Sequence, residues 1–140
     1  IKNNIIKLKN INFDLIITSS MKRTIETAKA YGYYDIKISP LSNEINFGSF
    51  EGLSRDILIN KYKFEWYNDM KKIPIGEKFD DFVCRVSQFI KTYKEYSNLL
   101  IFGHGAFLRA LVAYSKSIKI EKMNNIIIGH NQILNIEINE

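Results

Sequence analysis

Hydrophobic residues recur with helical and strand periods in turn along the chain. Residues 1–8 place apolar side chains on one helical face, and residues 14–18 form a short apolar run typical of a buried strand. A second helical pattern begins at residue 21 and ends at Gly32, a usual stop residue. Residues 36–39 then predict a short strand. The first third of the chain therefore alternates helix and strand.

A long irregular segment follows, over residues 41–54, with neither period and two glycines. Ser54 is expected to cap a helix that runs to about Met70, as Ser19 and Ser20 are for the helix at residue 21.

The second half of the chain repeats the alternation. Residues 79–93 give the clearest amphipathic helix, residues 98–102 a buried strand, and residues 106–114 another helix. The tail alternates at Leu134, Ile136 and Ile138, which predicts a half-buried strand or hairpin. The order predicts an α/β fold, a mostly parallel sheet between helical layers.

Composition narrows the classes of protein. A chain of 140 residues, 46% of them hydrophobic, fits one globular domain, and its apolar runs are too short to span a membrane. The net charge of +5 is spread among interleaved acidic residues, which disfavours nucleic-acid binding and leaves small anions as candidate partners. The oligomeric state stays open.

Cysteine and histidine are scarce. The single Cys84 cannot form an internal disulfide, which favours a reducing, cytoplasmic location, and its place in the helix 79–93 predicts an inert packing residue. Two histidines and one cysteine are too few and too far apart for a usual metal site, so neither a metal nor another cofactor is expected.

Candidate chemistry gathers where two strands become helices. Arg23 falls in the first turn after "LIITSS", and His104 stands between Gly103 and Gly105 after "LLIF". Ligands of parallel sheets bind at the carboxyl ends of the strands, where helix N-termini offer free N–H groups to a phosphate. An arginine there supplies a planar, charged fork for phosphate oxygens.

Each residue also has an ordinary interpretation. Arg23 alone is typical of a solvated surface, and a lone His104 of a hydrogen-bonded core histidine. Glu44 is a single carboxylate in a loop. Arg109 is expected to be a surface or salt-bridge residue, and His130 to lie in a turn without a catalytic role.

Four segments together are much more specific. "SSMKRTIETA", "LSNEINFGSFEGLS", "PIGEKFDDFVCRV" and "FGHGAFLRAL" resemble, in order and spacing, the histidine phosphatase superfamily, the phosphoglycerate-mutase-like group. The short segment between Leu53 and His104 is similar to the small phosphatases of that family, such as alpha-ribazole phosphatases, rather than to the glycolytic mutases.

The resemblance implies a mechanism and a set of site residues. A histidine attacks the phosphoryl group, and water hydrolyses the phosphohistidine. Glu44 matches the family's acid and base, Arg23 its second phosphate-binding arginine, and His104 its second active-site histidine. Gly105 is expected to offer its N–H to the phosphate. The implied partner is a small phosphate ester or inorganic phosphate.

The family's first strand, which ends in Arg-His-Gly and carries the nucleophile, has no counterpart in this sequence. We expect residues 1–140 to form a single domain that lacks this N-terminal segment, whose strand would lie beside the strand that ends at Phe102.

Two further interpretations stay open: an inactive member that binds a phosphorylated ligand or a partner, and a mutase. Tyr62, Trp66 and Tyr67 are expected to be core residues rather than walls for a ring-bearing leaving group.

Overall fold

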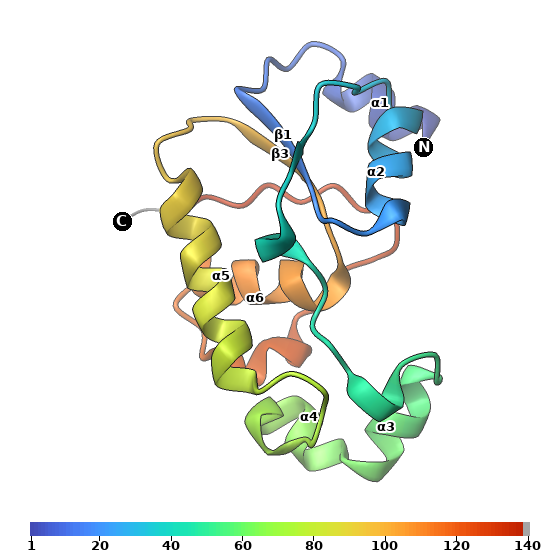
Figure 1. The fold of residues 1–140 in the computed structure, drawn as a ribbon, viewed down its shortest axis with the longest axis vertical. Coiled ribbons are helices and arrows are strands. Elements are labelled where there is room, and N and C mark those ends of the chain that lie inside the picture. The colour runs from blue at the N-terminus through green and yellow to red at the C-terminus, as the bar shows by residue number, and fades with distance from the viewer. Residues whose placement is uncertain (139–140) are drawn as a thin grey trace.

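Three parallel strands form the centre of the molecule, a computed structural model whose described residues are 1–138 (Figure 1). They are β1 (Leu15–Thr18), β2 (Lys37–Ile38) and β3 (Leu99–Phe102), in the order β2-β1-β3. The register pairs Ile17 with Ile101 and Lys37. The expected parallel sheet is therefore confirmed.

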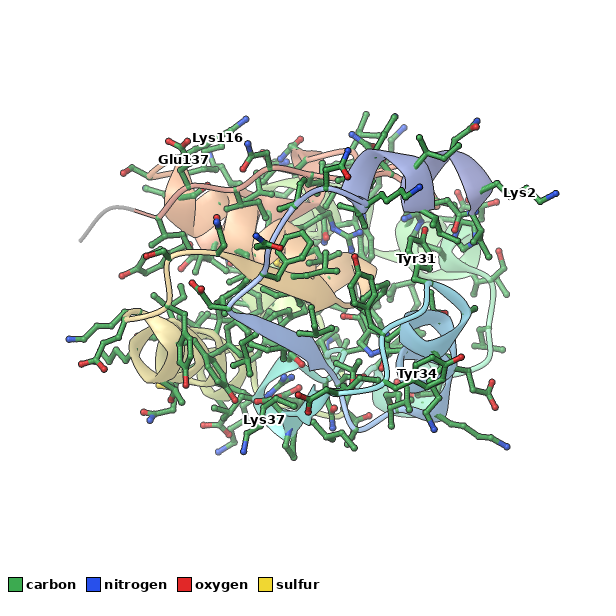
Figure 2. All side chains as sticks on the ribbon, turned by 90° about the horizontal axis from the view of Figure 1, so that it is seen from above. Lys2, Tyr31, Tyr34, Lys37, Lys116 and Glu137 are labelled. Atoms are coloured by element: carbon green, nitrogen blue, oxygen red, sulfur yellow. The ribbon has the colours of Figure 1, made fainter. Side chains whose placement is uncertain are left out.

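Helices flank the sheet on both sides, in both views (Figures 1 and 2). On one side are α1 (Lys2–Leu8) and α2 (Lys22–Ala30), and on the other side is α5 (Phe79–Tyr93). The remaining helices are α3 (Arg55–Lys61), α4 (Lys63–Asn68) and α6 (Gly105–Ser115), with short 3-10 helices at Pro40–Ser42, Gly48–Phe50, Met70–Lys72 and Ile120–Asn125. The predicted α/β architecture is confirmed.

The hydrophobic core joins β1, α5 and α6. The Phe89 ring of α5 meets the Phe107 ring of α6 edge to face, with centroids 5.2 Å apart. On the α2 side, Tyr31 packs in the same way on Phe102 at the end of β3. The fully buried apolar side chains include Ile17, Ile45, Met70, Phe82, Val86, Phe107, Leu111 and Met123. This core fixes the start of α6 against the end of β1.

The expected helix from Ser54 to Met70 is broken into two helices, α3 and α4. Ser54 caps α3 as predicted, because its hydroxyl accepts the N–H of Asp56. The chain then turns at Tyr62, whose φ and ψ of −127° and 44° are not helical, and α4 begins at the next residue. The helical spacing of the aromatic residues predicted which side chains face the core, but it did not predict the break at Tyr62. Trp66 lies in the core, as expected.

Two other local expectations are wrong. Met21, not Ser19 or Ser20, is the N-cap of α2, and no side-chain cap bond forms there. The Ser20 hydroxyl bonds Asn43, and the Ser19 hydroxyl bonds His104, Thr24 and the N–H of Met21. Cys84 lies in α5 as predicted, but it is exposed and does not pack in the core. Buried and exposed side chains lie next to each other along the sequence of this amphipathic helix, and Cys84 lies on its solvent-exposed face.

The predicted C-terminal strand or hairpin is not formed within the described part of the chain. Residues 134–138 alternate as expected: Leu134, Ile136 and Ile138 are half-buried, and Asn135 and Glu137 are exposed. This segment runs beside the end of α6, where Figure 2 shows Glu137 near Lys116. Alternation predicts which side chains face inward, but a strand also needs a hydrogen-bonding neighbour.

Strand β3 is less buried than its sequence suggests. All of its residues are half-buried, and among residues 1–138 it pairs only with β1. Its other edge therefore carries backbone N–H and C=O groups without a strand partner in the described structure. The further strand beside Phe102 stays a prediction. Within the same described range, no helix is both long and apolar enough to cross a membrane.

Candidate functional site

The site is centred on His104, which is the N-cap of α6 and only 5% exposed. Its Nδ1 lies 3.0 Å from an Nη2 atom of Arg23, and its Nε2 lies 2.8 Å from Oγ of Ser19. Because a guanidinium only donates, Nδ1 must accept, and the ring proton therefore sits on Nε2. His104 is thus neutral, with its Nδ1 lone pair toward the Arg23 side chain.

A chain of hydroxyl groups supports this tautomer. Ser19 Oγ accepts the Nε2–H of His104 and the N–H of Met21, at 2.8 and 3.1 Å, so its own proton is left for Thr24 Oγ1 at 2.8 Å. The Thr24 hydroxyl in turn donates to the Met21 carbonyl at 2.9 Å. The segment between β1 and α2 therefore orients a ring that belongs to α6.

Glu44 reaches α6 from the irregular segment, as the N-terminal partner of that helix. Its Oε2 accepts the N–H of Ala106 and its Oε1 accepts the N–H of Phe107, each at 3.1 Å. Oε1 also accepts the N–H of Ile45 at 3.1 Å. Two N–H groups at the start of α6, which were expected to be free for a phosphate, are therefore bonded to Glu44. The negative carboxylate is also stabilised by the positive end of the helix dipole.

Arg23 and Gly105 complete the group. Arg23 lies in the first turn of α2, as predicted, and its side chain is exposed apart from the bond to His104. Gly105, the first residue of α6, has no hydrogen bond from its N–H to any described residue. A side chain at Gly105 would meet Nη1 of Arg109 at 3.1 Å, so the glycine permits this close approach. All four predicted site residues therefore lie at the start of α6.

Burial and charge set the protonation preferences. Burial lowers the pKa of His104 below its ordinary 6.5, Glu44 opposes this shift, and Arg23 and Arg85 add to it. Burial also lowers the pKa of Arg109, and the negative charge of Glu44 opposes that change. The site therefore combines a neutral imidazole with several cations around one carboxylate.

Arg109 was expected to be a surface or salt-bridge residue, and this expectation is wrong because its side chain is buried. Its Nε donates to Oδ1 of Asn124 at 3.2 Å, and Asn124 is bonded in turn to the Trp66 carbonyl at 3.1 Å. The sequence did hold a signal for a place near the site, because Arg109 lies four residues after Gly105 and residues at that spacing share a helix face. His130 lies in an exposed turn, as expected.

A hollow of about 490 Å³ lies away from this site. It is lined by residues 13–16 and 32–37, at the beginning of β1, whereas Ser19 and His104 follow the ends of their strands. Within the same residues, no group of three or more histidine, cysteine, aspartate or glutamate side chains is placed to hold a metal ion.

Comparison with known proteins identifies the family of the chain. The sequence model of the histidine phosphatase superfamily, branch 1, matches residues 5–140. The chain therefore belongs to this superfamily. It is 34% identical over 113 residues to human 6-phosphofructo-2-kinase/fructose-2,6-bisphosphatase 4. The aligned region covers 76% of this chain and 24% of the human protein.

Solved structures share the fold. The alpha-ribazole phosphatase from Shigella flexneri matches with a TM-score of 0.66 and 30% identity, over 86% of this chain and 65% of that one. The protein of open reading frame Rv3214 from Mycobacterium tuberculosis matches with a TM-score of 0.73 and 21% identity, over 96% and 78%. The chain spans about a quarter of the length of the curated relatives that it matches.

Proposed function

We propose that this protein is a phosphomonoesterase that hydrolyses a small phosphate ester through a phosphohistidine intermediate. The observation that supports it most is the meeting of His104, Arg23 and Glu44 at the start of α6. Superfamily relatives include a fructose-2,6-bisphosphatase and alpha-ribazole phosphatases, so a phosphorylated small molecule is the proposed partner. The single cysteine favours a cytoplasmic setting.

Phosphoryl transfer depends mainly on positioning and on neutralising negative charge. In the proposal, Arg23 turns its exposed guanidinium to the phosphoryl oxygens, and the Gly105 N–H donates to one of them. His104 donates from Nδ1 once it takes up a proton, because its Nε2–H stays with Ser19. The transferred group thus lies between α2 and α6.

Glu44 supplies the proton transfers. Oε1 already accepts two N–H groups and Oε2 only one, so Oε2 has the free position for a proton. In the first step the attacking histidine nitrogen forms a bond to phosphorus, the ester P–O bond breaks, and Oε2–H protonates the leaving oxygen. In the second step Glu44 takes a proton from water as that water displaces the histidine and releases phosphate.

We propose that the attacking histidine comes from chain outside these 140 residues. His104 has both ring nitrogens engaged, and His130 lies in an exposed turn. One edge of β3 has no strand partner among residues 1–138, and it offers a place for a further parallel strand whose end would reach the same site. This proposal extends the single domain of residues 1–140 by one N-terminal segment.

The test uses full-length protein expressed from the complete gene. Incubation with a phosphate ester labelled in its phosphorus should give released phosphate and, after rapid quenching, a protein-bound label that is labile in acid and stable in base. Transfer of the label to a second acceptor hydroxyl instead of water would indicate a mutase. Binding of the ester without turnover would indicate an inactive, ligand-binding member and would refute the proposal.

A further inference from the structure

A half-buried ion pair, Arg85 with Glu77, contacts the segment that carries Glu44. Arg85 of α5 binds Glu77 with two parallel contacts, Nε to Oε2 at 3.1 Å and Nη2 to Oε1 at 3.0 Å. Both side chains are less than one fifth exposed. The guanidinium also lies over the Phe82 ring, 5.0 Å from its centroid. Such a two-point pair fixes the plane of the guanidinium as well as its position.

The pair holds the backbone on both sides of Glu44. Before it, the remaining Nη1 of Arg85 donates to the Leu41 carbonyl at 2.9 Å and to the Asn43 carbonyl at 2.6 Å. After it, Oε1 of Glu77 accepts the N–H of Asn46, and the Glu77 N–H donates to the Asn46 carbonyl, both at 3.1 Å. The backbone is therefore hydrogen-bonded to the ion pair both before Glu44, at Asn43, and after it, at Asn46.

Two neighbouring contacts stiffen the same segment. Gly48 and Gly76 approach so closely that a side chain on Gly48 would lie 2.7 Å from the Gly76 N atom. On the opposite side, Oδ1 of Asn43 accepts the N–H and the hydroxyl of Ser20, at 2.8 and 2.9 Å. The segment that carries Glu44 is thus tied to α5 on one side and to the start of α2, with Arg23, on the other.

We infer that Arg85 and Glu77 are positioning residues for Glu44, holding its carboxylate at the start of α6 so that Oε2 meets the leaving oxygen. The hydrogen bonds of the two side chains go to each other and to the backbone of Leu41, Asn43 and Asn46, so in this inference they act through that backbone. The inference rests on the proposed function of Glu44 as the proton donor.

The first test measures kcat of the full-length protein on two esters, an alkyl phosphate with a poor leaving group and an aryl phosphate with a good one. Arg85→Lys keeps the charge but loses the fork, and Glu77→Gln removes the pair. Each should lower kcat on the alkyl ester on the order of 10- to 100-fold, the cost of misplacing a reacting group by about 1 Å. The aryl ester, which needs little protonation, should lose much less.

Two controls separate positioning from general damage. Asp80, like Arg85, lies in α5, and it forms an exposed ion pair with Lys71. Asp80→Asn removes the carboxylate of that pair and should leave kcat on both esters unchanged. In a Glu44→Gln background, Glu77→Gln should cause no further loss on the alkyl ester, because the positioned group is already absent. Equal losses on both esters, or additive losses in the double variant, would overturn the inference.

A second measurement does not depend on activity. Glu44 accepts the N–H groups of Ala106 and Phe107, so their hydrogen exchange in NMR reports its placement. Arg85→Lys should accelerate exchange at these two amides and leave the middle of α6 unchanged; no change would contradict the inference. If Glu44→Gln shows no preference between the esters while the exchange result holds, the proposed function fails and the positioning stands.

Discussion

Ser19→Ala is the most informative single change for the structure of the site. The hydroxyl of Ser19 is fully buried and has three partners: His104 Nε2, Thr24 Oγ1 and the N–H of Met21. Its removal leaves the His104 and Met21 donors without acceptors, whereas Thr24 keeps its bond to the Met21 carbonyl. The variant therefore tests whether this small hydroxyl orients the imidazole.

The expected cost follows from those two donors. A buried donor left without a partner costs about 1–3 kcal/mol. His104 is 5% exposed and belongs in the upper part of that range, while Met21, at the exposed start of α2, belongs in the lower part. We expect Ser19→Ala to lower the free energy of unfolding by about 2–4 kcal/mol, a large share of the ~5–15 kcal/mol of a typical domain.

Urea denaturation measures this loss, with Ser115→Ala as the matched control. The Ser115 hydroxyl is half-buried and bonds only the Val112 carbonyl among the described contacts, so its loss should cost about 1 kcal/mol or less. Nitrogen NMR of the imidazole gives the second readout: the Nε2–H tautomer of His104 in the parent and a mixture in Ser19→Ala. Equal stability of the two variants with an unchanged tautomer would refute the reasoning.

Three further changes test other parts of the structure. Burial lowers the pKa of His104 below 6.5, so the folded state binds fewer protons than the unfolded state. The contribution of the neutral His104 to the free energy of unfolding is therefore complete above pH 6.5 and is lost as the pH falls. In urea denaturation, the stability advantage of the parent protein over His104→Gln should shrink between pH 7.5 and 5.5. Gly48→Ala should lower the melting temperature more than Gly52→Ala, because both glycines have positive φ but only Gly48 faces backbone within 3 Å; equal shifts would contradict this. Arg23→Ala should weaken binding of inorganic phosphate in calorimetry about 10- to 100-fold, the value of a charged hydrogen bond, whereas exposed Lys22→Ala should not.

Local patterns predicted most of the fold. Helix and strand periods place α2, α5, α6 and the strands close to their observed bounds, because burial of one face dominates these elements. The break at Tyr62 and the unpaired tail were missed for one reason. Periodicity reports which side chains face inward, and it contains no information on the partner that a backbone segment will meet.

The clustering of the four candidate residues was predicted from the sequence, but its geometry was not. Motif order placed Arg23, Glu44, His104 and Gly105 together, and the structure brings them to one helix end. The use of helix N–H groups by Glu44 and the burial of Arg109 depend on contacts between segments some 60 and 15 residues apart. Such contacts leave no local pattern in the sequence.

The central claim is that Glu44 donates the proton to the leaving oxygen beside His104. The direct measurement is kcat of full-length Glu44→Gln on an alkyl phosphate, with an aryl phosphate in parallel. We predict a loss of about 10²- to 10⁴-fold on the alkyl ester, the usual contribution of a general acid, and a much smaller loss on the aryl ester. Full activity of Glu44→Gln on the alkyl phosphate would contradict the account.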